Sequence, residues 1–191
     1  MSEISIVGVS GSLSKPSRTS ALVSAVLEGI SIKSGLPATL LELSDSAAEL
    51  FAARSSASAS PPARKFLEQV EQADLLVIGT PVYRASYTGA LKHLFDLVDH
   101  RSFSGKPIVL TATGGSLLHA LVIEHQLRPL FGFLNALTLP TSVYAVEADF
   151  SSYSLVRPEI HERIERIASE VVLHLPRTAA SRRAEAKAVT V

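Results

Sequence analysis

The sequence lacks cysteine, net charge and any long apolar run, and each absence excludes a class of protein. Without cysteine there are no disulfide bonds, no thiolate nucleophile and no cysteine-ligated metal. The 18 basic and 18 acidic residues cancel, so no electrostatic argument favours nucleic acid or an anionic membrane as a partner. No run reaches the roughly 18 apolar residues of a membrane-spanning helix, and the N-terminus shows no signal-peptide pattern. We therefore expect a cytoplasmic protein without nucleic-acid or membrane partners.

Several phosphate-binding and catalytic motifs are also missing. Gly8 and Gly11 are followed by no third glycine at dinucleotide-binding spacing, and the P-loop motif is absent. The nucleophile elbow of serine hydrolases fails because Ser12 occupies the place of its second glycine. The six histidines have no partners at metal-ligand spacing. We therefore expect no metal site.

Apolar patterns predict an alternating α/β chain. Unbroken apolar runs of strand length lie at residues 4–9, 38–43, 74–79, 108–112 and around 143–145. Helical periodicity covers residues 18–30, a segment after Pro61 and Pro62, and residues 90–98, 117–134 and 158–175. Five strands that alternate with helices predict a doubly wound parallel sheet with helices on both faces. We expect one domain over residues 1–176, a long irregular connection over 44–62 and a flexible tail over 177–191.

The stretch from Val7 to Ser20 predicts a strand, a hydroxyl-rich loop and a helix start, in that order. At a helix start, free backbone N–H groups and the positive end of the helix dipole bind anions. The same loop offers hydroxyl and cationic side chains as further donors: Ser10, Ser12, Lys15, Ser17, Arg18, Thr19 and Ser20. No metal-binding motif accompanies these side chains, so the loop suits a phosphate monoester that is bound without magnesium. Taken alone, the loop fits an ordinary serine-rich turn equally well.

Two further loops are expected at the same edge of the sheet, because ligands of such sheets bind beyond the carboxyl ends of the strands. Residues 80–88 present Pro81, Val82 and Tyr83, a wall that suits a flat ring. The turn at residues 113–116 contains Gly114 and Gly115, whose backbone N–H groups can stabilise negative charge on such a ring. Each loop by itself also fits a plain surface turn.

Three stretches resemble a known family: GSLSKPSRTS from Gly11, TPVYRASYTGALKHLFDLVD from Thr80 and ATGGSLLHALVIEHQLRPLFGFL from Ala112. They are similar to the NAD(P)H-dependent FMN reductases of two-component sulfonate monooxygenase systems, above all those of methanesulfonate and alkanesulfonate assimilation. The resemblance spans roughly residues 4–175. It implies a flavodoxin-like fold with strand order 2-1-3-4-5 and FMN at the carboxyl edge of the sheet.

The resemblance also implies which residues bind FMN. The phosphate would be held by Ser10, Ser12, Arg18, Thr19 and Ser20; the isoalloxazine ring would be lined by Pro81, Val82, Tyr83, Arg84 and Ala85; its pyrimidine side would meet Thr113, Gly114 and Gly115. Alkanesulfonate-type relatives often carry an arginine where this sequence has Ser14, and Lys15 would replace its charge.

By the same resemblance, NADH or NADPH would donate a hydride to N5 of FMN, and reduced FMN would pass to a monooxygenase that cleaves an organosulfur compound. The flavin carries this chemistry, so we expect no catalytic acid, base or nucleophile. His125 stands where relatives carry a π-bulge in a helix that joins subunits, which implies a homodimer or homotetramer.

Two other functions suit the same fold. One is a reductase of quinones or azo dyes in which FMN stays bound. The other is a non-enzymatic flavodoxin-like electron carrier, although such carriers are commonly strongly acidic and this chain is neutral.

Overall fold

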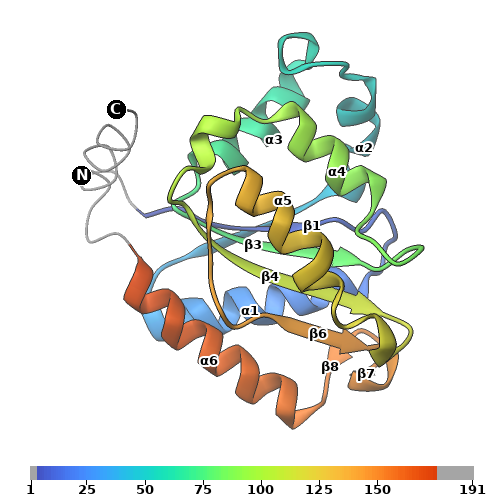
Figure 1. Cartoon of the computed structure of the whole chain (residues 1–191), viewed down its shortest axis with the longest axis vertical. Helices are drawn as coiled ribbons and strands as arrows, with labels where there is room; N and C mark the ends of the chain where they lie inside the picture. Colours follow the sequence, from blue (N-terminus) through green and yellow to red (C-terminus); the bar gives the residue numbers. More distant parts are fainter. Residues whose placement is uncertain (1–3, 176–191) are drawn as a thin grey trace.

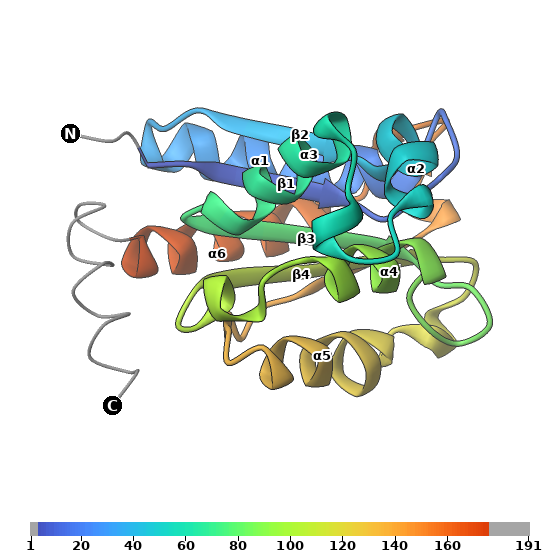
Figure 2. The same ribbon diagram turned by 90° about the horizontal axis from the view of Figure 1, so that it is seen from above.

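The computed structural model describes residues 4–175, so the predicted tail lies outside the described residues. Its centre is a parallel sheet whose strands follow one another as β2-β1-β3-β4-β5. Figure 2 shows the first four of these side by side, and Figure 1 shows the sheet between its helices. The four long strands are β1 (Ile6–Ser10), β2 (Ala38–Glu42), β3 (Leu75–Pro81) and β4 (Pro107–Gly114). This order confirms the predicted doubly wound, flavodoxin-like topology.

The fifth place in the sheet is shared by two short strands, so the sheet has six strands where the sequence predicted five. β5 (Leu137–Thr138) pairs with the start of β4, and β6 (Val143–Val146) pairs with its end. Pro140 lies between them. Proline cannot donate a hydrogen bond to a sheet ladder, which accounts for the interruption. The strand predicted around residues 143–145 is confirmed as β6.

Helices cover both faces of the sheet (Figure 1). One face packs against α1 (Arg18–Ser34) and α6 (Pro158–His174). The other packs against α2 (Leu43–Ala52), α3 (Pro61–Gln72), α4 (Gly89–Leu97) and α5 (Arg128–Phe133). The side chains of successive strand residues point to opposite faces of the sheet, so Leu76 and Ile78 pack in one core while Leu75 and Val77 pack in the other. This two-sided burial explains the unbroken apolar runs of the sequence.

The segment predicted as a long irregular connection contains a helix. α2 begins at Leu43, and a short 3₁₀ turn follows at Ser56–Ser58. Leu43 and Leu50 are seven residues apart, on the same side of a helix, and both are buried. The prediction was wrong because serine and alanine fill the remaining positions and leave little periodicity.

The long helix predicted over residues 117–134 is interrupted. A 3₁₀ turn at Leu117–His119 precedes a π-helical segment at Ile123–Leu127, which leads into α5. The Arg128 N–H bonds to the Ile123 carbonyl, five residues back, and Pro129 follows. Proline has no N–H and clashes with the preceding turn, which favours a wider helix just before it. The π-helical segment contains His125, as the resemblance implied.

A 3₁₀ turn and a hairpin after β6 close the carboxyl edge, and another 3₁₀ turn precedes β4 at the opposite edge. 3₁₀ turns lie at His100–Phe103 and at Glu147–Asp149, and the second leads into a hairpin of β7 (Phe150–Ser151) and β8 (Ser154–Leu155). Within residues 4–175, no helix is both long and apolar enough to cross a membrane.

Candidate functional site

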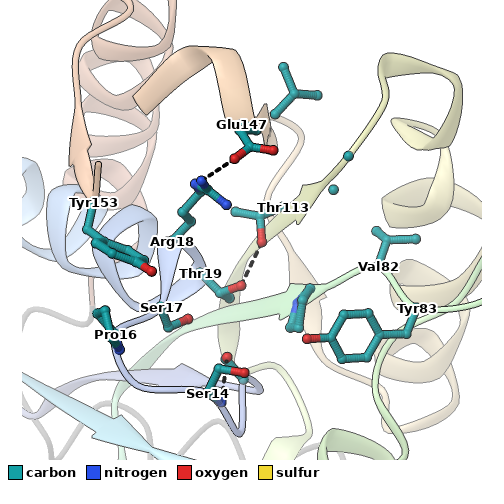
Figure 3. Close-up of a pocket in the computed structure, with 15 residues that line it drawn as sticks. Ser14, Pro16, Ser17, Arg18, Thr19, Val82, Tyr83, Thr113, Glu147 and Tyr153 are labelled. Atoms are coloured by element: carbon teal, nitrogen blue, oxygen red, sulfur yellow. Dashed lines mark hydrogen bonds and ion pairs between the residues drawn. The ribbon is translucent and has the colours of Figure 1, made fainter. Parts of the chain in front are cut away.

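A cavity of about 310 Å³ opens at the carboxyl edge of the sheet (Figure 3). The three loops that the sequence predicted for this edge all contribute to it. Its walls are formed by Ser12, Ser14, Pro16, Ser17, Arg18, Thr19, Pro81, Val82, Tyr83, Thr113, Gly114, Gly115, Val146, Glu147 and Tyr153. The volume lies at the lower end of the range of small-molecule pockets.

The start of α1 forms one wall of the cavity. Ser17 caps the helix, because its hydroxyl accepts a hydrogen bond from the Ser20 N–H at 3.2 Å and its carbonyl accepts one from the Ala21 N–H at 3.0 Å. Arg18 and Thr19 line the cavity, and no hydrogen bond within the described part of the chain uses their N–H groups. The helix start therefore leaves unused the backbone donors that the sequence proposed for an anion, and anion binding itself stays a prediction.

Arg18 is held across this wall by two residues from the other end of the chain. Its guanidinium forms an ion pair with Glu147 and lies over the Tyr153 ring, with Cζ 5.8 Å from the ring centroid (Figure 3). Its Nε is buried and has no hydrogen-bond partner among the described residues. A buried donor without an acceptor costs free energy, so a phosphate oxygen at this point would satisfy it. The donor set fits the phosphate group of FMN.

The first and third loops are tied together below the cavity. Thr19 Oγ1 and Thr113 Oγ1 lie 2.6 Å apart, and both residues are buried. Gly114 packs so closely on Tyr144 that an added Cβ would lie 2.1 Å from the Tyr144 hydroxyl oxygen. At Gly115 an added Cβ would meet nothing within 4 Å, so its backbone borders open space. This open backbone is what a bound flat ring would need in order to approach the N–H groups.

The second loop forms a strained hairpin. The Tyr83 N–H bonds to the Ser86 carbonyl at 3.0 Å, and the Ser86 N–H bonds to the Tyr83 carbonyl at 3.1 Å. The two residues between them, Arg84 and Ala85, have φ of 52° and 64°. Positive φ at both positions defines a type I′ turn, which costs about 1–2 kcal/mol for each residue that is not glycine. The turn leaves Tyr83 55% exposed beside Pro81 and Val82.

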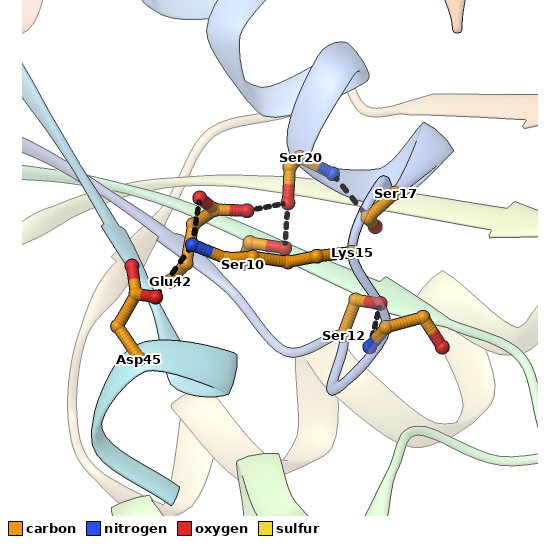
Figure 4. Close-up of polar contacts among 8 residues, drawn as sticks. Ser10, Ser12, Lys15, Ser17, Ser20, Glu42 and Asp45 are labelled. Atoms are coloured by element: carbon orange, nitrogen blue, oxygen red, sulfur yellow. Dashed lines mark hydrogen bonds and ion pairs between the residues drawn. The ribbon is translucent and has the colours of Figure 1, made fainter.

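Five of the predicted site residues do not line the cavity. Arg84 and Ala85 form the turn just described. Ser10, Lys15 and Ser20 belong to a polar network behind the loop, centred on Glu42 (Figure 4). The Ser20 hydroxyl lies 2.9 Å from Ser10 Oγ and also contacts the Glu42 carboxylate. Because a hydroxyl has a single proton to donate, Ser20 donates it to the carboxylate and accepts a hydrogen bond from Ser10.

Lys15 points into the same network rather than into the cavity. Its Nζ lies 3.2 Å from Glu42 Oε2 and bonds to Asp45 at the start of α2. The hydrogen bonds to Asp45 and Glu42 raise the pKa of Lys15 above its usual value. The two cations of the loop therefore face different surroundings.

Six lining residues lie outside the predicted set: Ser14, Pro16, Ser17, Val146, Glu147 and Tyr153. The first three belong to the loop that the sequence had already marked. Val146 and Glu147 follow the last predicted strand. Since ligands of such sheets bind beyond the carboxyl ends of the strands, the sequence could have predicted that these two residues border the site. Tyr153 comes from the β7–β8 hairpin, for which the sequence carries no signal that we can identify.

A sheet of this order with a cavity at its carboxyl edge defines a flavodoxin-like protein with a small-molecule site. Residues 4–151 match the family of NADPH-dependent FMN reductases, to which the chain therefore belongs. By class it is a flavin reductase, as the sequence predicted.

Individual relatives agree with this assignment. The chain is 49% identical to the NADH-dependent FMN reductase SfnF of Pseudomonas putida over 89% of this chain and 92% of that protein. It is 45% identical to an FMN reductase (NADPH) of Pseudomonas aeruginosa over 88% and 90%. Its structure matches the apo form of an NADH:FMN oxidoreductase, EMOB, with a TM-score of 0.82, 26% identity and 94% of each chain covered.

Proposed function

We propose that this protein reduces FMN with NADH or NADPH in the cytoplasm and releases the reduced flavin to a monooxygenase of organosulfur assimilation. The observation that carries the proposal is the cavity itself. It combines free helix-start N–H groups with an arginine donor, an aromatic wall and an unshielded glycine turn. The family and the named relatives support the FMN reductase activity; the organosulfur role follows the resemblance seen in the sequence.

Each part of the cavity has a proposed role. Ser12, Arg18 and Thr19, with the α1 N-terminus, bind the phosphate. Pro81, Val82 and Tyr83 flank the ring, and the backbone at residues 113–115 donates to its pyrimidine side. When bound, FMN supplies the ring system that accepts the hydride, so the protein contributes binding and orientation rather than a proton-transferring side chain.

The five predicted residues outside the cavity receive supporting roles. Ser10, Lys15 and Ser20 hold the phosphate loop against Glu42. Arg84 and Ala85 set the shape of the turn that presents Tyr83. The nicotinamide is NADH or NADPH, since the named relatives include one enzyme of each kind.

The test is oxidation of NADH and NADPH by the purified protein, followed at 340 nm with and without added FMN. An FMN reductase requires free FMN and yields reduced FMN, detected anaerobically. Rapid turnover of a quinone or azo dye by protein that retains FMN would instead identify an acceptor reductase. A protein that binds FMN and oxidises no nicotinamide would be an electron carrier.

We also propose that the protein forms a homo-oligomer through the π-helical region that carries His125. Apolar side chains around this region are strongly exposed in the single chain: Leu117, Leu118, Leu121 and Phe133, with Leu118 90% exposed. Clustered exposed apolar residues commonly mark an interface. Light scattering would contradict the proposal by returning the monomer mass of 20.3 kDa.

A further inference from the structure

The cavity contains one cation and one carboxylate, and the two are paired. Among the described residues that line it, Arg18 and Glu147 alone carry formal charge. Glu147 is 72% exposed at its side chain, and it reaches the guanidinium from the turn that follows β6. The charge of Arg18 is therefore already neutralised before any anion enters the site.

The second cation of the loop cannot take over this task where it stands. Lys15 lies outside the cavity and is shared between Glu42 and Asp45. A phosphate monoester carries a charge of about −1.5 to −2 at neutral pH. It would thus enter a site in which both nearby cations already have carboxylate partners.

These contacts lead to an inference that rests on the proposed function and adds a determinant of flavin release. We propose that Glu147 competes with the FMN phosphate for Arg18 and thereby keeps FMN a dissociable substrate. Phosphate gains the guanidinium only as the Glu147 contact weakens. When the flavin leaves, Glu147 pairs with Arg18 again.

Two features of the geometry allow this exchange. The Glu147 carboxylate is mostly in solvent, so water replaces Arg18 as its partner and breaking the exposed ion pair costs little free energy. Arg18 does not need to swing away, because Tyr153 supports it from the other side and its buried Nε still lacks an acceptor. The exposed terminal N–H groups can therefore turn from Glu147 to the phosphate while the side chain stays in place, and this small shift lets Nε gain an acceptor.

The test is equilibrium binding of FMN to Glu147→Gln without nicotinamide, followed by quenching of flavin fluorescence. Removing the carboxylate while keeping its shape is expected to lower the Kd for FMN about two- to fivefold and to slow FMN release. The Kd for riboflavin, which lacks the phosphate, should stay unchanged. As a matched control, Glu162→Gln removes the same charge from exposed α6, outside the cavity, and should leave both constants unchanged.

A double variant separates competition for Arg18 from simple repulsion of the phosphate. In the Arg18→Ala background, competition predicts that Glu147→Gln no longer tightens FMN binding. A full gain in that background, an unchanged FMN Kd in Glu147→Gln alone, or an equal gain for riboflavin would each overturn the inference. If the parent protein binds FMN, any of these results contradicts the role of Glu147 but not the proposed function. If neither the parent nor any variant binds FMN, both the role of Glu147 and the proposed function are wrong.

Discussion

Arg18 and Lys15 lie three residues apart in the same loop, yet the fold gives them different positions. Arg18 borders the cavity, over the Tyr153 ring and beside Glu147 (Figure 3). Lys15 points away from the cavity to Glu42 and Asp45 (Figure 4). From the sequence alone both are candidate phosphate ligands. Both cations pair with carboxylates from other elements, but only Arg18 and its partner Glu147 line the cavity, so only Arg18 is placed to meet a ligand there.

The largest expected effect is that of Arg18→Ala on FMN binding. Hydrogen bonds to charged groups contribute about 1.5–3 kcal/mol, so the Kd for FMN should rise roughly 10- to 150-fold. Riboflavin binding should barely change, because the lost contact is to the phosphate. Titration of both flavins by fluorescence measures the two constants. Equal weakening of FMN and riboflavin would place Arg18 outside the phosphate site.

A third cation, Lys106, extends the comparison to a buried position. It lies just before β4, at the edge of the sheet opposite the cavity, and its Nζ donates to the carbonyls of Val70 at 3.1 Å and Glu71 at 2.7 Å. The Nζ also lies 4.8 Å from the centroid of the Phe103 ring. Burial lowers the pKa of Lys106 to about 8. A neutral amine keeps two N–H donors, so both carbonyl contacts survive loss of the proton.

This pKa makes stability depend on pH. Between about pH 8 and 10.5 the unfolded chain binds more protons at Lys106 than the folded chain, so the free energy of unfolding rises with pH. Relative to Lys106→Met, the parent should gain about 2 kcal/mol from pH 7 to 9.5. Urea unfolding of both proteins at the two pH values measures the difference. A constant difference would show that Lys106 keeps an ordinary pKa in the folded protein.

The smallest expected effect is that of Lys15→Met. The side chain is 48% exposed, it lies outside the cavity, and its ion pair with Asp45 is at the surface, where such pairs contribute little. The Kd for FMN should change by less than about threefold, measured beside Arg18→Ala in the same titration. A loss as large as that of Arg18→Ala would mean that Lys15 turns toward the bound phosphate, and the contrast between the two cations would then hold only without ligand.

Much of the sheet was predictable because its strands are buried on both faces. The runs at residues 74–79 and 108–112 identify β3 and β4 directly, and the five-place order agrees with the resemblance. α2 and the π-helical segment were not predictable to the same degree. In α2 two buried leucines anchor a serine- and alanine-rich helix. In the second case Pro129 widens a helix whose periodicity predicts an unbroken one.

The candidate site likewise contains residues that the sequence predicted and lacks others that it predicted. Ser12, Arg18, Thr19, Tyr83 and the glycines of the third loop are found together because parallel strands bring their carboxyl ends to one edge. Ser10, Lys15 and Ser20 are drawn into contacts with Glu42, which lies at the end of the neighbouring strand. The residue types of the loop alone do not predict these contacts with Glu42.

The sequence by itself determined the alternating α/β topology, the family and the place of the hydroxyl-rich loop at the start of α1, since these follow from local periodicity and from contiguous motifs. Only the tertiary structure decided how the charges of the loop are used. Glu147 pairs with Arg18 although the two residues are 129 positions apart, and Tyr153 joins them from a hairpin without a sequence signal. Such contacts depend on where the ends of separate strands meet in space, which no local pattern of residues encodes.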